Sequence, residues 1–291
     1  MDGVLNIFKN KKMTSFDVVR KVKKVAHEKK VGHTGTLDPE ATGVLPVCLG
    51  RATKIIDYIM NDDKSYYVSF KLGVITTTYD MEGDIIEENS IDSITEEQIL
   101  KAIDNYRGEY LQVPPMYSAL KKDGVRLYEL ARKGIEIERE GRKVNIKDIN
   151  DINIKLPIVS MNVTCSKGTY IRSLCYDIGQ YLKVGATVTE LKRTRTFNFF
   201  EADSVNIDDL DEDNIQEYII PIKEALNNYP SLVVNKKFQK LLSNGVKVCD
   251  KTINNDSIKI DTLYTVLTEE GELIGLGKRD KNGFKIEKLL N

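Results

Sequence analysis

The sequence of 291 residues has no tryptophan, two histidines and only four cysteines. The cysteines lie far apart and form no C-x-x-C pair, so we expect reduced thiols rather than disulfides or zinc ligands. No run of about 18 apolar residues occurs, and residues 1–15 lack the apolar core of a secretory signal. These absences predict a cytoplasmic protein with no membrane span and no metal site.

Charge is nearly balanced but unevenly distributed. The formal net charge is −1, yet residues 9–30 contain nine Lys or Arg and two acids, whereas residues 201–217 contain eight acids and no base. Further basic residues cluster within 121–147 and 192–195. Segregation of this kind can produce a basic face for a polyanion on a neutral protein. Solvated helix faces would give the same pattern, so charge by itself leaves both explanations open.

Hydrophobic patterning predicts a mixture of strands and helices. The helices do not alternate regularly with single strands, which favours an α+β fold with a largely antiparallel mixed sheet and flanking helices. Residues 135–150 are polar and charged, and we expect a mobile arm there. The expected strands are 3–8, 65–73, 84–88, 158–165 and 186–199. One helix is expected after the cap at Thr14 or Ser15, and further helices are expected over 95–108, 123–134 and 169–183.

The end of the chain predicts a second, smaller domain. The acidic segment 201–217 resembles a domain boundary, and short helices are expected at 222–227 and 236–243. Strands are expected near 263–268, 273–277 and 284–288. The last part is close to the lower size at which a domain folds independently. We therefore predict a large domain over 1–228 and a small β-rich domain over 229–291.

The stretch GHTGTLDPEATGVLPVCLGRATK, residues 32–54, places Asp38 in a loop broken by Gly and Pro, just before an apolar run. This combination predicts a rigid element that holds a reactive carboxylate toward a ligand. The Walker pattern and the G-x-S-x-G pattern are both absent, which argues against a P-loop nucleotide site and a serine hydrolase. Two alternatives stay open, since Asp38 and Glu40 could act as paired carboxylates, and an Asp before Pro is a common turn residue.

The same stretch closely resembles the signature loop of the TruB family, the bacterial tRNA pseudouridine-55 synthases. Further motifs occur in the order of that family and extend the resemblance over residues 1 to about 200. One departure lies in KNKKMTS, residues 9–15, which lacks the Pro and Gly that usually form a turn before the Thr-Ser cap. The additional motifs are DKSYYV (63–68), PPMYSALKKDGVRLYELAR (114–132), CSKGTYIRSL (165–174) and LKRTR (191–195).

The resemblance implies the fold, the activity and the site residues. It implies a pseudouridine synthase fold with a small PUA-like RNA-binding domain at the C-terminal end. Asp38 corresponds to the catalytic aspartate, and Arg172 to the arginine that pairs with it and holds it ionised. Tyr66 corresponds to the tyrosine that packs against the target base and can assist the final deprotonation at C5. Tyr170 and Leu191 correspond to residues that line the nucleotide pocket, and His33 to the histidine associated with displacing the target uridine.

The implied reaction isomerises uridine-55 in the T-loop of tRNA without a metal or other cofactor. The carboxylate can add to the sugar or the base, or remove a proton to give a glycal-like species, and the sequence does not choose between these routes. The base must be flipped out of the folded T-arm, and residues 123–147 are expected to form an RNA-binding insertion that closes on the RNA. We expect a monomer. The alternatives are a tRNA-binding or folding module in which catalysis is secondary, and an RNA-guided relative.

Overall fold

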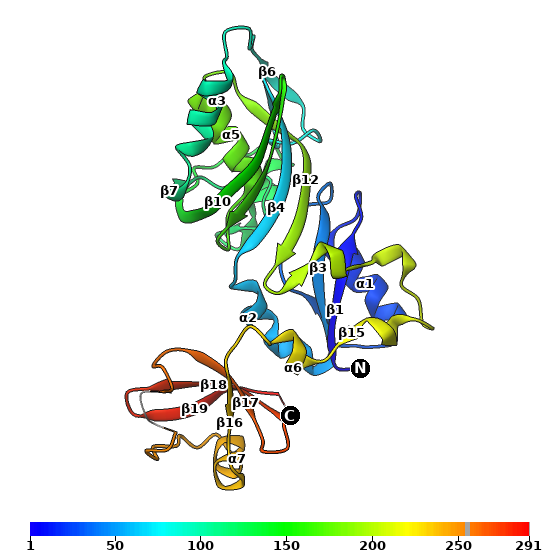
Figure 1. Ribbon diagram of the computed structural model, residues 1–291. Helices are drawn as coiled ribbons and strands as arrows, with labels where there is room; N and C mark the ends of the chain where they lie inside the picture. The colour runs from blue at the N-terminus through cyan, green and yellow to red at the C-terminus, as the bar shows by residue number, and fades with distance from the viewer. Residues whose placement is uncertain (254–256, 291) are drawn as a thin grey trace.

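The computed structural model describes residues 1–253 and 257–290. It consists of a large body built around a long twisted sheet and a small β-rich domain at the C-terminal end (Figure 1). Within the described residues, we find no helix with the length and apolar character needed to cross a membrane.

The main sheet has eleven strands, and its principal path runs β14-β1-β3-β12-β4-β11-β10-β7. Only the pairs β1–β14 and β3–β12 are parallel, so the prediction of a largely antiparallel mixed sheet is confirmed. β2, β13 and β15 pair with β3, β12 and β1 beside this path. The bounds are β1 Gly3–Lys9, β2 Val31–His33, β3 Thr42–Leu49, β4 Lys64–Leu72, β7 Gly108–Gln112, β10 Arg142–Lys155, β11 Ile158–Cys165, β12 Ala186–Thr196, β13 Phe199–Phe200, β14 Val205–Asn206 and β15 Ile219–Ile220.

Helices pack against this sheet and form the core. α5 (Ile171–Tyr181) buries the apolar face that the sequence predicts, with Ile171, Leu174, Cys175 and Ile178 at most 3% exposed. α3 (Glu96–Asp104) begins at the predicted capping box, in which Thr95 and Gln98 exchange both hydrogen bonds. The other helical elements of this region are α1 (Ser15–Val25), η1 (Gly50–Ile55) and α2 (Ile56–Met60).

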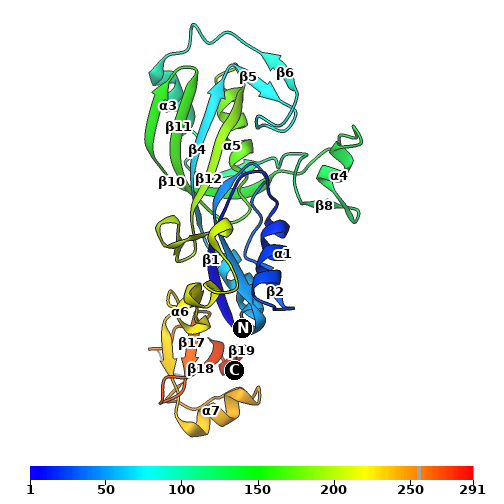
Figure 2. The ribbon, with the colours of Figure 1, turned by 90° about the vertical axis from the view of Figure 1, so that its right-hand side faces the viewer.

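The predicted helix over 123–134 is wrong in its first half. Asp123 and Gly124 have φ angles of 51° and 83° and form the turn of a hairpin between β8 (Lys121–Lys122) and β9 (Val125–Arg126). An Asp-Gly pair favours such a turn because both of its positions require positive φ. Only α4 (Leu127–Ala131) is helical, and Figure 2 shows α4 and β8 projecting from the body on the side of α1.

Two other expectations need correction. Residues 142–150 of the expected arm belong to β10, where they pair with β7 and β11. The acidic segment 201–217 is part of the main body and not a boundary, because β14 pairs with β1 and Ile207 and Ile215 are fully buried. This segment consists of η2 (Glu201–Asp203), β14, η3 (Ile207–Asp209) and η4 (Ile215–Tyr218).

The acidic segment also neutralises part of the basic region at the start of the chain. Asp208 lies 3.0 Å from Lys21 of α1, and Glu212 lies 3.3 Å from His27. The lysines of α1 therefore do not all contribute to a free basic face.

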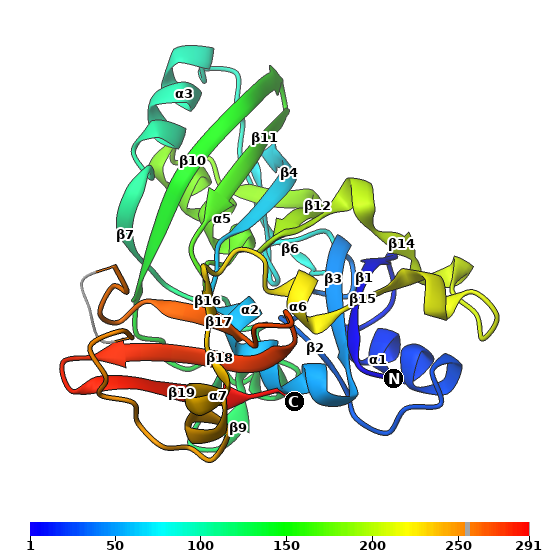
Figure 3. The ribbon, with the colours of Figure 1, turned by 60° about the horizontal axis from the view of Figure 1, so that its bottom comes forward.

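The small domain contains a four-stranded sheet in the order β16-β17-β18-β19 with α7 beside it (Figure 3). It contacts the body at η1, where Lys54 Nζ donates to the Leu289 carbonyl at 2.9 Å, and its Leu290 packs in a cluster with Val4 and Ile55. The elements after the acidic segment are α6 (Ile222–Ala225), β16 (Ser231–Val233), α7 (Lys236–Ser243), β17 (Leu263–Leu267), β18 (Leu273–Asp280) and β19 (Gly283–Leu289).

Candidate active site

Asp38 lies in the loop between β2 and β3, which is fixed by hydrogen bonds on both sides of it. The Ser15 hydroxyl, buried at the start of α1, accepts from Leu37 N at 2.8 Å. On the other side, the Pro39 carbonyl accepts from Lys12 N at 2.9 Å and from Lys9 Nζ at 3.1 Å. The loop around Asp38 is therefore tied by hydrogen bonds to the start of α1 and the end of β1.

A glycine at the start of β3 allows this loop to approach β12 closely. Gly43 has a φ of 105°, and a Cβ atom there would lie 2.2 Å from the Arg193 carbonyl oxygen. No other residue fits this position without displacing β12.

Arg172 approaches Asp38 from the first turn of α5. Its Nε lies 2.9 Å from Asp38 Oδ2, and its Nη1 lies 3.4 Å from Asp80 Oδ2. Nη1 also donates to the Thr78 carbonyl at 2.9 Å, and Nη2 to the Tyr117 carbonyl at 2.8 Å. The guanidinium is therefore held between two carboxylates and two carbonyls. This geometry keeps a positive charge beside the Asp38 carboxylate.

A pocket opens at this ion pair. Asp38, Asp80 and Arg172 line it together with Leu191 of β12 and Lys11. The pocket thus combines carboxylates, among them Asp38, with a buried cation and apolar side chains. Within the residues that the structure describes, no three His, Cys, Asp or Glu side chains are grouped so that they could hold a metal ion.

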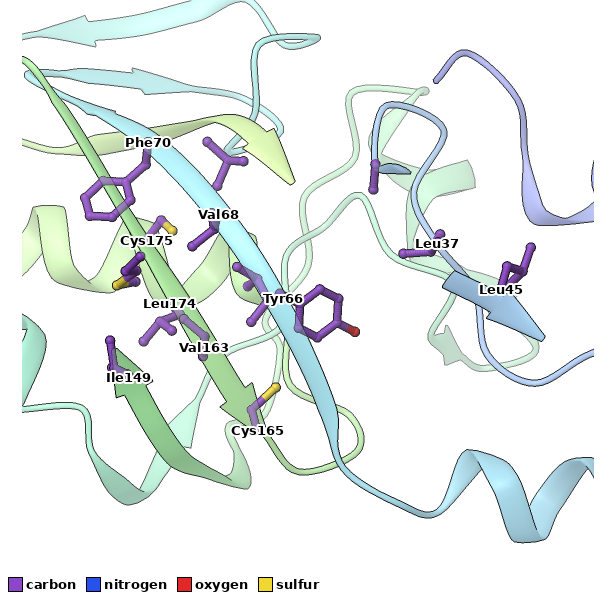
Figure 4. Close-up of a cluster of buried hydrophobic side chains, with 14 of the residues drawn as sticks. Leu37, Leu45, Tyr66, Val68, Phe70, Ile149, Val163, Cys165, Leu174 and Cys175 are labelled. Carbon is purple, nitrogen blue, oxygen red and sulfur yellow. The ribbon is translucent and has the colours of Figure 1, made fainter. Parts of the chain in front are cut away.

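Tyr66 lies on β4, where β11 and β12 flank it. Its ring is buried in the core cluster and projects from β4 toward the loop that carries Leu37 (Figure 4). Burial raises the pKa of Tyr66 to about 12, while a hydrogen bond from Arg193 acts in the opposite direction. The charge of Asp38 also raises this pKa, so the phenol lies within electrostatic reach of the carboxylate. The hydroxyl is therefore neutral at rest.

Tyr170 and His33 come from two different elements. Tyr170 is the N-cap residue of α5, and burial raises the pKa of its hydroxyl, whereas the Ser118 side chain acts to lower it. His33 ends β2, and its Nδ1 accepts from Gly35 N at 3.2 Å. Burial and the charge of Arg193 lower the pKa of His33 and favour the neutral imidazole. No hydrogen bond joins His33 to Asp38 within the described part of the chain.

Sequence reasoning assigned no role to several buried charges around the site. Asp80, the second partner of Arg172, lies in a Thr-rich turn that gave no sign of chemistry. Arg193 belongs to the LKRTR motif, but the motif did not indicate that this side chain is only 1% exposed. Its Nε donates to the Val44 carbonyl at 2.7 Å and its Nη2 to the Gly35 carbonyl at 3.1 Å.

Two buried lysines bind backbone carbonyls in the same way. Lys9 Nζ donates to the Asn10 and Met13 carbonyls at 2.9 Å, in addition to its bond to Pro39. Lys64 Nζ donates to the Met60 carbonyl at 2.9 Å and the Asp62 carbonyl at 3.1 Å. Burial lowers the pKa of each lysine to about 8. Lys9 was counted in the basic region of residues 9–30, and no prediction was made for Lys64, because nothing local in the sequence indicates that either lysine is buried.

Comparison with known proteins gives matches along the whole chain. Residues 23–171 match the family described as TruB family pseudouridylate synthase (N terminal domain), and residues 172–227 match the tRNA pseudouridylate synthase B C-terminal domain. A protein of Clostridium perfringens named tRNA pseudouridine synthase B is 56% identical over 291 residues, which is 100% of this chain and 99% of that protein. A protein of the same name from Clostridioides difficile is 41% identical, covering 97% of this chain and 96% of that protein.

Solved structures also resemble this chain. A crystal structure of a Cbf5-Nop10-Gar1 complex contains a chain with a TM-score of 0.76 and 28% identity, and the match covers 99% of this chain and 85% of that chain. An H/ACA RNP bound to a substrate RNA containing 2′-deoxyuridine gives a TM-score of 0.73 at 25% identity, with coverage of 99% and 85%.

Proposed function

This chain belongs to the TruB family of pseudouridylate synthases, and we propose that it isomerises uridine-55 in the T-loop of tRNA to pseudouridine with Asp38 as the catalytic carboxylate. The observation that carries this proposal is the ion pair between Asp38 and Arg172 inside a pocket. The names of the relatives support tRNA as the substrate. The T-loop position rests on the resemblance of the loop that carries Asp38.

The reaction breaks the C1′–N1 bond of uridine, rotates the base and joins C5 to the sugar. Asp38 starts this sequence, either by adding to the nucleoside or by removing a proton that gives a glycal-like species. Both routes require an ionised and accessible carboxylate. The Asp38 side chain is 36% exposed, whereas Arg172 is 5% exposed, so substrate can reach the acid while the cation stays fixed.

The other predicted site residues take supporting roles in this proposal. Tyr66 packs against the base, and its hydroxyl assists the removal of the C5 proton. Tyr170 and Leu191 line the nucleotide pocket. His33, which burial keeps neutral, helps displace the uridine from the T-loop stack and avoids the cost of burying a further cation. The reaction needs no metal or other cofactor.

The RNA contacts extend beyond the pocket. The target base is flipped out of the T-arm at a cost of about a few kcal/mol, offset by contacts in the pocket. Basic groups within 9–30 and 121–147 bind phosphates, and the part of the insertion before β10, residues 123–141, closes on the RNA. We further propose that 1–228 form the catalytic domain and that 229–291 form a PUA-like RNA-binding domain. The enzyme acts as a monomer in the cytoplasm.

The direct test uses an unmodified tRNA transcript with tritium at C5 of its uridines. We expect release of one equivalent of tritium, mapped to position 55. Asp38→Asn should lower the rate by at least about a thousandfold and leave RNA binding intact, because the amide cannot act as a base or nucleophile.

Glu40→Gln is the matched control, since it changes a second acid of the same pocket. Near-normal turnover of this variant would exclude the paired-carboxylate alternative. Full activity of Asp38→Asn would overturn the proposal and favour a tRNA-binding module, and release at a different uridine would overturn the T-loop assignment.

A further inference from the structure

Gln112 is a buried polar residue at the end of β7, eleven residues before the insertion. Its side-chain amide contacts the backbone of Tyr170 at two points. Tyr170 N donates to Gln112 Oε1 at 2.8 Å, and Gln112 Nε2 donates to the Tyr170 carbonyl at 3.0 Å. The residue is 1% exposed, so water does not compete for these bonds. Two opposed bonds fix both the position and the rotation of the Tyr170 backbone.

Tyr170, the residue that Gln112 contacts, lies where α5 begins. Tyr170 is the N-cap of α5, and its own side chain makes no capping hydrogen bond. Arg172, which pairs with Asp38, follows two residues later in the first turn. The direction in which α5 begins therefore determines where the guanidinium lies. Gln112 supplies from outside the helix the restraint that a capping side chain would otherwise provide.

The orientation of the Gln112 amide is itself determined. Its Nε2 also donates to the Tyr110 hydroxyl. Asp177, farther along α5, acts electrostatically on that hydroxyl. The oxygen of the amide must accept from Tyr170 N, so exchanging the amide nitrogen and oxygen would break both bonds to the Tyr170 peptide. Through its contacts with Tyr110 and with the Tyr170 peptide, Gln112 thus joins β7 to the start of α5.

The same two segments share another bond that provides a comparison. The Ser173 hydroxyl donates to the Val113 carbonyl at 2.9 Å. It also joins α5 to the end of β7, but it does not touch the Tyr170 peptide. If Gln112 only held two segments together, loss of either bond would have the same kind of effect.

We propose that Gln112 is a positioning residue for the reaction: its amide holds the Tyr170 peptide and thereby places the Arg172 guanidinium against Asp38. The inference rests on the proposed function, since it takes the Arg172–Asp38 pair as part of catalysis. Gln112 does not touch the substrate. Its effect should appear in the rate of the chemical step rather than in RNA affinity.

The experiment compares Gln112→Met, which keeps the volume and removes the amide, with Ser173→Ala as the matched control. Tritium release gives kcat and KM, and thermal unfolding shows that each variant is folded. Gln112→Met should lower kcat by about tenfold or more, with KM within about twofold. Ser173→Ala should keep kcat within about twofold.

A double-mutant cycle tests the route through Arg172. In an Arg172→Lys background, adding Gln112→Met should cause little further loss, because the group being positioned is already absent. A full additional loss, or equal kcat losses for Gln112→Met and Ser173→Ala, would overturn the proposal. If Gln112→Met does not fold, Tyr110→Phe removes only the support of the amide and should give a smaller decrease in kcat with unchanged KM. An unchanged kcat in Tyr110→Phe would then count against the proposal.

A readout without RNA separates this inference from the proposed function. The NMR signal of the Arg172 Nε–H group, identified by its absence in Arg172→Lys, reports its contact with Asp38. Gln112→Met should shift this signal, and Ser173→Ala should not. A shifted signal in an enzyme that releases no tritium would refute the proposed function and retain the positioning role. An unshifted signal would refute the positioning role alone.

Discussion

The Arg172 guanidinium is almost completely buried, yet its Nε lies 2.9 Å from the Asp38 carboxylate, of which about a third is exposed. Carbonyls of Thr78 and Tyr117 and the carboxylate of Asp80 hold the remaining nitrogens of Arg172. The protein therefore fixes the cation from behind and leaves the anion open to the pocket. If Asp38 acts as we propose, little reorganisation is needed during the reaction, because the charge of Arg172 is already in place.

Replacing Arg172 should affect the chemical step far more than binding. Arg172→Lys keeps a charge, but a lysine cannot reach two carboxylates and two carbonyls, so we expect kcat to fall by about a hundredfold or more. Asp80→Asn leaves the pair with Asp38 and should cost about tenfold. Single-turnover rates and RNA affinities measure both effects. A larger loss for Asp80→Asn than for Arg172→Lys would contradict this ranking.

Lys64 should make stability increase with pH above about 8. Its pKa is lowered to about 8 by burial, so between pH 8 and 10.5 the unfolded chain holds a proton that the native protein has released. The free energy of unfolding then rises with pH, by up to about 3 kcal/mol. Urea unfolding of wild type and Lys64→Met isolates this contribution as the difference between the two curves, with Lys155→Met as an exposed control. A difference in unfolding free energy between wild type and Lys64→Met that stays constant from pH 7 to 10 would rule out this contribution of Lys64.

Asp177 should make the free energy of unfolding decrease with rising pH in a lower pH range. Burial raises its pKa to about 7, while the Tyr110 hydroxyl acts against this. Between pH 4 and 7 the native protein keeps a proton that the unfolded chain has lost, so the free energy of unfolding falls as pH rises. Asp177→Asn should remove about 2–4 kcal/mol of this decrease. Unfolding curves of the two proteins that remain parallel over this range would contradict the prediction.

RNA affinity should depend steeply on salt, with a log–log slope of about −0.7 to −0.9 for each phosphate contacted. The lysines of α1 should contribute unequally. Lys21 pairs with Asp208, whereas Lys24 is exposed and has no ion pair within the described residues. Lys24→Gln should therefore make the log–log slope less steep by the amount expected for about one phosphate contact. Lys21→Gln should change the slope less. Filter binding over a salt series measures both slopes, and a flat response of wild type would exclude a basic RNA-binding face.

Elements with explicit local signals could be predicted from the sequence. The capping box of Thr95 and Gln98 fixes the start of α3, and the apolar spacing of Ile171, Leu174 and Ile178 identifies the buried face of α5. The hairpin turn at Asp123 and Gly124 was missed because the residues after it have helical spacing, which was extended back over the turn. At Asp123 and Gly124 the preference of an Asp-Gly pair for a turn outweighs the helical spacing of the residues that follow.

The surroundings of the catalytic pair could not be predicted in this way. Resemblance identified Asp38 and Arg172, but the partners of Arg172 are backbone carbonyls, which any residue provides. Likewise, nothing in the local sequence distinguishes Lys9 and Lys64 from surface lysines, although both are buried. Such contacts depend on long-range pairing, and a local pattern does not encode them.

The place of β12 in the sheet has a consequence for the synthesis of the protein. This strand lies between β3 and β4, although it follows both of them by more than a hundred residues along the chain. While the ribosome is still translating the first half, β3, which follows the Asp38 loop, and β4, which carries Tyr66, lack the neighbour that joins them. A nascent chain thus acquires no working pocket until β12 has emerged, and fragments that end before it should be unable to modify RNA.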